Sequence, residues 1–293
     1  MTVFSLWTSS PRYSVFGASE FVFIRCIRLM LDRSPRPRVG AIAHELNQTH
    51  HLFNQFTIDL KCCALFNGSH RVSIRNFMPN TLTISTLKTE ARAFAVQESA
   101  FPEPSLYGVT DGKAVGTYLE HKFQAYLHTK YRYVEGSSAK GIDFPELEVD
   151  IKVTSIRQPQ SSCPFKSARQ KIYGLGYNLL VFVYEKTDDE AARTGRLNIL
   201  HTIFVDRART ADFQTTSGLA RIIENDGNLD DILAFFGERM LPLDDIQAQT
   251  LAEEVLANPP DIGYLTISNA LQWRLQYSRV IQQAGAITGI EAL

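Results

Sequence analysis

The sequence contains no long hydrophobic run and few cysteines. Its longest mainly apolar segment, from Phe16 to Leu31, is interrupted by Glu20, Arg25 and Arg28, so it falls short of a membrane span. A secretory signal would need a cleaner apolar segment close to the terminus. Four cysteines in 293 residues do not indicate a disulfide framework. The absence of such a framework is typical of proteins in a reducing compartment. We therefore expect a cytoplasmic protein without a membrane partner.

Two common catalytic motifs are also missing. The segment GVTDGK, from Gly108 to Lys113, is similar to a phosphate-binding loop, but its two glycines are one residue too close together. Ala114 also stands where such a loop needs Ser or Thr, so we expect no nucleotide cofactor. No G-x-S-x-G nucleophile elbow is present, and Cys163 has no histidine close to it in the sequence.

Residues 1–77 differ in composition from the remainder of the chain. They hold nine Lys/Arg and four Asp/Glu, a net charge of +5, whereas residues 78–293 hold 21 and 27, a net charge of −6. Their apolar residues occur in clumps without helical or strand periodicity. We predict that residues 1–77 are an N-terminal extension, either poorly ordered or preceding the true start at Met78. Residues 78–243 would form the functional core and residues 244–293 a helical C-terminal region.

One internal segment contains no acidic residue. The 34 residues from Ile151 to Tyr184 lack Asp and Glu although the region around them is acidic. A solvated loop and helix face is one explanation. The other is an anionic partner, because Lys and Arg bind phosphates and Arg and Gln can read base edges. The residues of this segment that we expect to contact DNA are Arg157, Gln158, Gln160, Lys166, Arg169 and Lys171.

The pattern of apolar residues between the breaks predicts a mixed α/β fold. A stripe at helical spacing, Val115, Leu119 and Phe123, predicts a helix from Ala114 to His128. The continuous apolar run Leu179 to Tyr184 is typical of a strand buried on both faces. Other predicted elements are strands at Tyr131–Val134 and Leu197–Asp206 and helices at Ser167–Gly174, at two places within Gly218–Gly237, and at Asp244–Asn258.

A last helix is predicted from Thr266 to Gln283. Trp273, Tyr277 and Ile281 would form its apolar stripe, and its exposed faces would carry Gln and Arg without acids. With the preceding helix it could form a helix-turn-helix-like reader of the major groove, in which Arg274 and Arg279 contact DNA. A dimerisation helix or a simple packing element is an equally open interpretation.

The segment Gly141 to Thr154, GIDFPELEVDIKVT, carries the chemistry. Polar and apolar residues alternate from Glu148 onward, so Glu148, Asp150 and Lys152 would share one face of a strand. If the central Pro-Glu pair forms a tight turn, Asp143 lies opposite Glu148 on that face. Unit charges at about 4 Å repel by about 4 kcal/mol at an effective dielectric near 20, and a bound cation would offset this. A solvated hairpin face is the alternative.

Asp143 followed by Asp150-Ile-Lys152 resembles the PD-(D/E)xK core of type II restriction endonucleases and several repair nucleases. The resemblance implies a mixed central sheet flanked by helices. It also implies that Asp143 and Asp150 bind Mg²⁺, that Lys152 activates the attacking water, and that Glu120 on the upstream helix assists. It covers roughly Val115 to Tyr184, about a quarter of the chain.

Two departures from that pattern leave the metal ligands open. Ile142 replaces the proline before Asp143, and the interval from Asp143 to Asp150 is short, so Glu148 could substitute for either acid as a metal ligand. We expect a Mg²⁺-dependent, sequence-specific endonuclease of the type II restriction kind that cuts double-stranded DNA as a homodimer. The alternatives are a junction-resolving or repair nuclease on the same core and a non-catalytic DNA-binding regulator.

Overall fold

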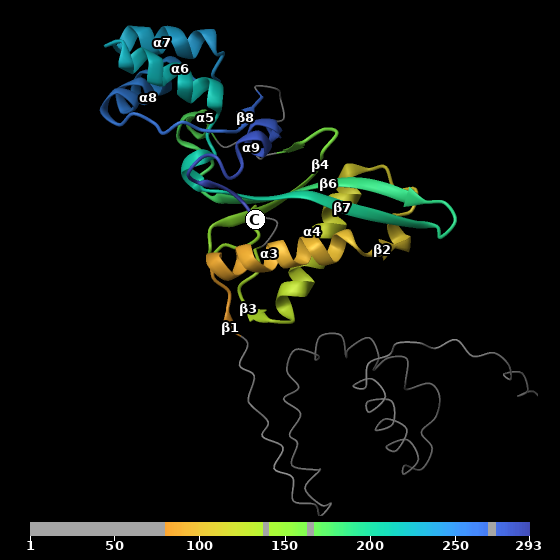
Figure 1. Ribbon diagram of the computed structural model, residues 1–293. Helices are drawn as coiled ribbons and strands as arrows, with labels where there is room; N and C mark the ends of the chain where they lie inside the picture. Colours follow the sequence, from red (N-terminus) through yellow and green to blue (C-terminus); the bar gives the residue numbers. More distant parts are fainter. Residues whose placement is uncertain (1–79, 137–140, 163–166, 269–273) are drawn as a thin grey trace, which may run out of the picture. The chain divides into compact units, whose positions relative to one another are not determined.

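The computed structural model describes residues 80–136, 141–162, 167–268 and 274–293 (Figure 1). The predictions for residues 1–77 and for Lys166 lie outside these ranges. None of the described helices is both long and apolar enough to cross a membrane.

A mixed sheet forms the centre of the described chain. Its strands lie in the order β10-β7-β6-β4, in which β4 and β6 are parallel and the other neighbours are antiparallel. The strand β2 pairs with the far end of β7. The predicted mixed sheet flanked by helices is therefore confirmed. The strands are β2 (Pro102–Glu103), β4 (Val149–Ser155), β6 (Asn178–Asp189), β7 (Thr194–Val205) and β10 (Ile290–Ala292).

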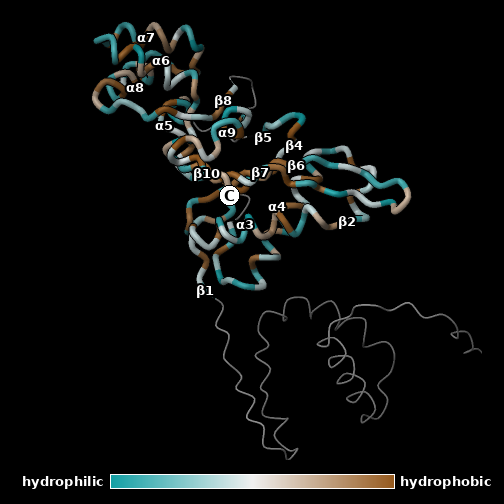
Figure 2. Tube along the Cα trace, in the orientation of Figure 1, coloured by the Kyte–Doolittle hydropathy of each residue, from teal (hydrophilic) through white to brown (hydrophobic). Residues whose placement is uncertain are grey.

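The predicted buried strand lies at the centre of this sheet, in β6. Side chains from Leu179 to Val183 have no exposed surface, and Figure 2 shows hydrophobic residues along this part of the sheet. Alternate residues face opposite sides, so Leu180 and Phe182 enter one core cluster while Leu179 and Val181 enter another. The pair β6 and β7 then extends beyond the core as a polar hairpin.

Two helices, α3 (Ile84–Ser99) and α4 (Gly112–His128), pack against the first face. The predicted helix over Ala114–His128 is confirmed as α4, which begins after Asp111, whose carboxylate accepts from the backbone N–H of Lys113. Phe123 of α4 lies 5.0 Å from Phe94 of α3 and 5.2 Å from Phe182, measured between ring centroids. These aromatic contacts hold α4 on the sheet beside β4.

A second small sheet covers the opposite face. Its strands are antiparallel in the order β5-β9-β8, and the helix α9 follows β9. Leu275, Tyr277 and Val280 are fully buried in the core cluster on this side. The elements are β5 (Gln160–Ser162), β8 (Thr266–Ile267), β9 (Arg274–Gln276) and α9 (Ser278–Gln283).

The predicted helix from Thr266 to Gln283 is wrong, and with it the helix-turn-helix interpretation. Arg274 and Gln276 are exposed, whereas Leu275 and Tyr277 are buried, which is the alternation of a strand. The helix begins only at Ser278 and spans six residues. In the described part of the C-terminal region, the helices are α8 and α9.

The remaining helices form a third cluster, in which α5 packs against α6, α6 against α7 and α7 against α8 (Figure 1). The predicted helices at Ser167–Gly174, within Gly218–Gly237 and at Asp244–Asn258 are confirmed with small changes of boundary. The helices are α5 (Arg169–Tyr173), α6 (Phe213–Glu224), α7 (Leu229–Glu238) and α8 (Asp245–Ala257). The short elements β1 (Asn80–Thr81), β3 (Tyr131–Arg132), η3 (Pro104–Leu106) and η4 (Arg207–Arg209) complete the described chain.

Candidate active site

The turn before β4 brings Asp143 next to Asp150. Phe144 pairs with Val149 across this turn, so the predicted pairing of Asp143 with Glu148 is wrong by two positions. In the observed register Asp143 lies alongside Asp150 instead. Its Oδ2 accepts a hydrogen bond of 2.7 Å from the backbone N–H of Ile151, which fixes the carboxylate against the strand.

Asp150 and Lys152 form a buried ion pair on β4. The Nζ of Lys152 lies 2.6 Å from Oδ2 of Asp150, and the side chains are 18% and 6% exposed. Burial raises the pKa of Asp150 to about 7, because Lys152 offsets this only in part and Asp143 adds to it. Burial lowers the pKa of Lys152, but Asp150, Asp143 and Glu120 raise it more, so the net pKa lies above the ordinary value. The ammonium therefore stays charged.

Glu120 joins this group from the facing helix α4. Burial, together with the nearby Asp143, raises the pKa of Glu120 to about 7, although Lys152 opposes both effects. The predicted orientation of Glu120 toward the acidic segment is therefore supported by its electrostatic neighbours. The structure brings together Glu120, Asp143, Asp150 and Lys152.

Glu148 is placed apart from the other acids. Its φ of +52° interrupts the strand pattern, so its side chain does not share the face of Asp150 and Lys152. Its Oε2 instead accepts from the guanidinium of Arg207 at 3.1 Å, and both side chains are more than half exposed. The expected patch of three acids on one strand face is therefore wrong, and the acid beside Asp150 is Asp143.

A large cleft of about 950 Å³ opens beside this group. Glu120 of α4 and Lys152 of β4 both line it. Several residues predicted to contact DNA line the same cleft, and two further lysines, Lys113 and Lys186, were not predicted. The predicted DNA contacts that line the large cleft are Arg157, Gln158, Gln160 and Arg274.

No sequence signal marks Lys186, because its place at the cleft depends on the length of the β6–β7 hairpin. Lys113 stands in the segment first compared with a phosphate-binding loop, and it occupies the first turn of α4. Its cationic side chain at a helix start beside a basic segment is a signal that could have found it.

Other predicted DNA contacts have structural partners elsewhere. Arg169 donates two hydrogen bonds to Glu254 and its guanidinium lies 4.4 Å from the ring centroid of Tyr173. Arg279 stacks over the ring of Phe213 at 3.7 Å. The structure therefore does not bring either arginine to the large cleft.

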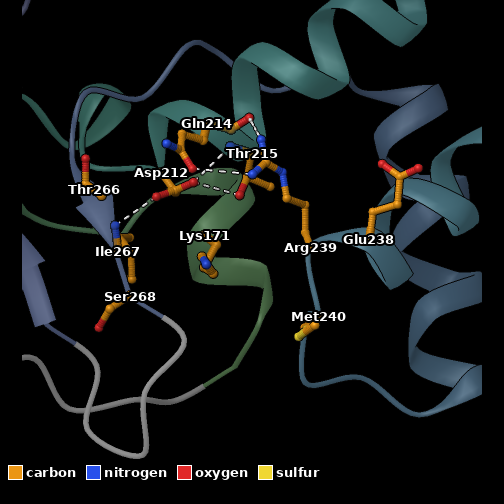
Figure 3. Close-up of a pocket in the computed structure, with 10 residues that line it drawn as sticks. All are labelled: Lys171, Asp212, Gln214, Thr215, Glu238, Arg239, Met240, Thr266, Ile267 and Ser268. Atoms are coloured by element: carbon orange, nitrogen blue, oxygen red, sulfur yellow. Dashed lines mark hydrogen bonds between the residues drawn. The ribbon is translucent and has the colours of Figure 1, made fainter.

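Lys171 lies in a second cavity of about 340 Å³ (Figure 3). Burial lowers the pKa of Lys171, with Asp212 opposing and Arg239 adding to the effect. Asp212 is only 4% exposed, and its carboxylate accepts from the N–H and hydroxyl of Thr215 and from the N–H of Ile267. Those hydrogen bonds tie α6 to β8, so the carboxylate of Asp212 has a structural role.

The chain is similar to known restriction enzymes. Residues 81–292 match the family model described as Type II restriction enzyme NspV. The type II restriction enzyme NspV of Nostoc sp. (strain ATCC 29411 / PCC 7524) is 65% identical over 209 residues, which cover 71% of this chain and 95% of that enzyme. No solved structure shows a significant match. The chain therefore belongs to the NspV family of type II restriction enzymes.

Proposed function

We propose that the chain cuts double-stranded DNA at a PD-(D/E)xK site in which Asp143 and Asp150 hold Mg²⁺, Lys152 activates the attacking water and Glu120 assists. As a type II restriction enzyme, the chain is a site-specific deoxyribonuclease. The observation that carries the finer proposal is the buried ion pair of Asp150 and Lys152, in which Nζ lies 2.6 Å from Oδ2. The carboxylate of Asp143 accepts a hydrogen bond from the backbone of the same strand.

The donor set of the site fits Mg²⁺. Among the described residues, no three His, Cys, Asp or Glu side chains are arranged to hold a metal. Mg²⁺ does not require three, because it keeps several waters and is usually bound by one or two carboxylates together with substrate phosphates. Asp143 and Asp150 supply two carboxylates, and the raised pKa of Asp150, about 7, reflects burial and repulsion that a cation would relieve.

Each residue of the site would have a separate role in hydrolysis. Asp143 and Asp150 would hold Mg²⁺, and a divalent ion held there would supply charge neutralisation at the phosphate and lower the pKa of the attacking water. Asp150 accepts a hydrogen bond from one N–H of the Lys152 ammonium, which leaves two N–H donors for the attacking water or a phosphate oxygen. Glu120, with a pKa of about 7, can take up or release a proton near neutral pH.

The charge of the large cleft suits a DNA backbone. Its lining carries Lys113 and Arg157 as exposed cations, and Lys/Arg contacts with phosphates supply most of the affinity for DNA. We also propose that the enzyme acts as a homodimer, since two-fold symmetry would place one site at each strand of a palindromic sequence. Sedimentation of the intact chain tests this by its mass.

Incubation of supercoiled plasmid DNA with the intact chain tests the proposal. With Mg²⁺ we expect discrete fragments that are the same in every digest, and with EDTA we expect intact plasmid, since the two carboxylates would have no cation to hold. Fragments that form equally well in EDTA would refute the metal site. A smear without discrete bands would refute sequence-specific cutting by this chain.

Glu148→Gln is expected to leave cleavage nearly unchanged. The carboxylate of Glu148 makes an exposed ion pair with Arg207, and such pairs contribute about 0–1 kcal/mol. We therefore expect a cleavage rate within about fivefold of wild type, measured on the same plasmid. A loss of about 100-fold or more, with an unchanged melting temperature, would show that Glu148 and not Asp143 completes the site.

A further inference from the structure

The small sheet β5-β9-β8 has one polar face and one buried face. Gln160 pairs with Gln276, and Ser162 pairs with Arg274, so these four side chains form two adjacent rows on one face. The alternate positions carry Leu275 and its neighbours, which face the core. We call the first set the polar face: Gln160, Ser162, Arg274, Gln276 and, from β8, Thr266, which pairs with Gln276.

The buried face holds the sheet rigidly in place. Leu275 has no exposed surface and Ile267 is 3% exposed, both in the core cluster beneath β6 and β7. The hydroxyl of Ser161 lies 2.5 Å from the hydroxyl of buried Tyr277, and the N–H of Tyr277 donates to the carbonyl of Pro159 at 2.8 Å. The polar face is therefore a fixed surface.

The polar side chains are available to a ligand. Within the described residues, the side chains of Gln160, Arg274 and Gln276 make no hydrogen bond or ion pair. Arg274 and Gln276 are exposed, while Gln160 is half-buried at the cleft. An arginine and two glutamines on a rigid surface carry the donor and acceptor groups that recognise purine edges.

We propose that the polar face of β5-β9-β8 reads base edges in the major groove of the DNA that the large cleft holds. This rests on the proposed function. The major groove admits a two-stranded β-ribbon, and β-ribbon readers place strand side chains against base edges. Arg274 has the geometry for two hydrogen bonds to guanine, and Gln160 and Gln276 have it for adenine. These contacts would carry sequence information, whereas phosphate contacts carry none directly.

The polar face is continuous with the catalytic strand. Gln160, Ser162 and Arg274 line the same cleft as Lys152 and Glu120. Thr154, two residues after Lys152, ties β5 to β4, because its hydroxyl accepts from the N–H of Gln160 at 2.9 Å. The bases that the polar face reads would therefore lie at a fixed offset from the bond that is cut.

The test compares cleavage at cognate and mismatched sites. Bacteriophage lambda DNA is digested with the wild-type enzyme, and the fragment ends are sequenced to define the site. Short duplexes with that site and with each single base-pair change are then cut by Arg274→Ala, Gln160→Ala and Gln276→Ala. We expect each variant to lose roughly 10- to 100-fold in the ratio of cognate to mismatched rate, at one position of the site.

Two matched controls distinguish a loss of base recognition from a general effect of removing a surface side chain. Arg196→Ala on β7 and Gln282→Ala on α9 remove exposed side chains of the same types away from the polar face, and the rate ratio should not change. A uniform loss at all duplexes, or an unchanged ratio in all three test variants, would overturn the proposal. If the wild type does not cut lambda DNA, the proposed function fails. Selection of bound sequences from a randomised duplex library then tests whether the polar face reads bases. A motif that the wild type enriches, and that Arg274→Ala no longer specifies at one position, would support the proposal. The absence of any enriched motif would overturn it.

Discussion

Lys152→Met is expected to slow plasmid cleavage by roughly 100- to 1,000-fold, the usual effect of removing one preorganised donor from a developing anion. Methionine keeps the length and apolar stem of lysine but has no charge and no proton to donate. The Lys152 ammonium is held 2.6 Å from Asp150 and is 18% exposed, so water has limited room to replace it. Single-turnover cleavage with saturating Mg²⁺ measures the chemical step.

Lys113→Met is the matched control for this experiment. Lys113 lines the same cleft but is exposed in the first turn of α4, so it can contact a phosphate without touching the reacting group. We expect the control to weaken DNA binding at raised salt and to leave the single-turnover rate at saturation within about fivefold of wild type. The role of Lys152 would be refuted if both variants cut equally fast, or if Lys152→Met lost only affinity for DNA.

The central strand β6 was predictable because its apolar composition fits only a strand that is buried on both faces. The run Leu179 to Tyr184 has apolar side chains at odd and even positions, and only a strand covered on both faces buries all of them. In the structure the even positions meet α3 and α4, and the odd positions meet β8, β9 and α9. The helix α4 was predictable for the same reason, since Val115, Leu119 and Phe123 fall on one face and are all buried.

The C-terminal strands β8 and β9 were not predicted because the apolar pattern of this segment fits both the helical and the strand period. Tyr277 and Ile281 satisfy a helical stripe, while Arg274, Leu275, Gln276 and Tyr277 alternate as in a strand. Pairing with β5, more than a hundred residues away in sequence, decides between the two, and a local pattern cannot report it. The alternation was the signal, but it is only four residues long.

The residue types of the candidate site were predictable, but not their geometry. Asp150 and Lys152 share a strand face, as their spacing predicts. The partner acid depended on the backbone at Glu148, whose positive φ removes that residue from the strand; the observed cross-strand pairing differs from the predicted one by two positions. A dihedral of this kind is rare outside glycine and asparagine, and no residue type in the segment indicates it.

Asp212→Ala is expected to lower the free energy of unfolding by about 3–5 kcal/mol. The carboxylate is 4% exposed and accepts three hydrogen bonds, from the N–H and hydroxyl of Thr215 and from the N–H of Ile267. Alanine would leave these donors buried without an acceptor, and it would also remove the anion that raises the pKa of Lys171. Urea unfolding with an unchanged m-value measures the effect.

Asp244→Ala is the matched control, because Asp244 also caps a helix, α8, by accepting from the N–H of Gln247 at 2.8 Å. That aspartate is exposed, so its loss should cost about 1 kcal/mol, the ordinary value of an N-cap. The difference between the two variants isolates what burial and the bond to Ile267 add to a cap. Equal losses of unfolding free energy in the two variants would show that Asp212 acts only as the N-cap of α6. A larger loss at Asp212 would show that it also fastens β8, and through β9 the polar face, to the body of the enzyme.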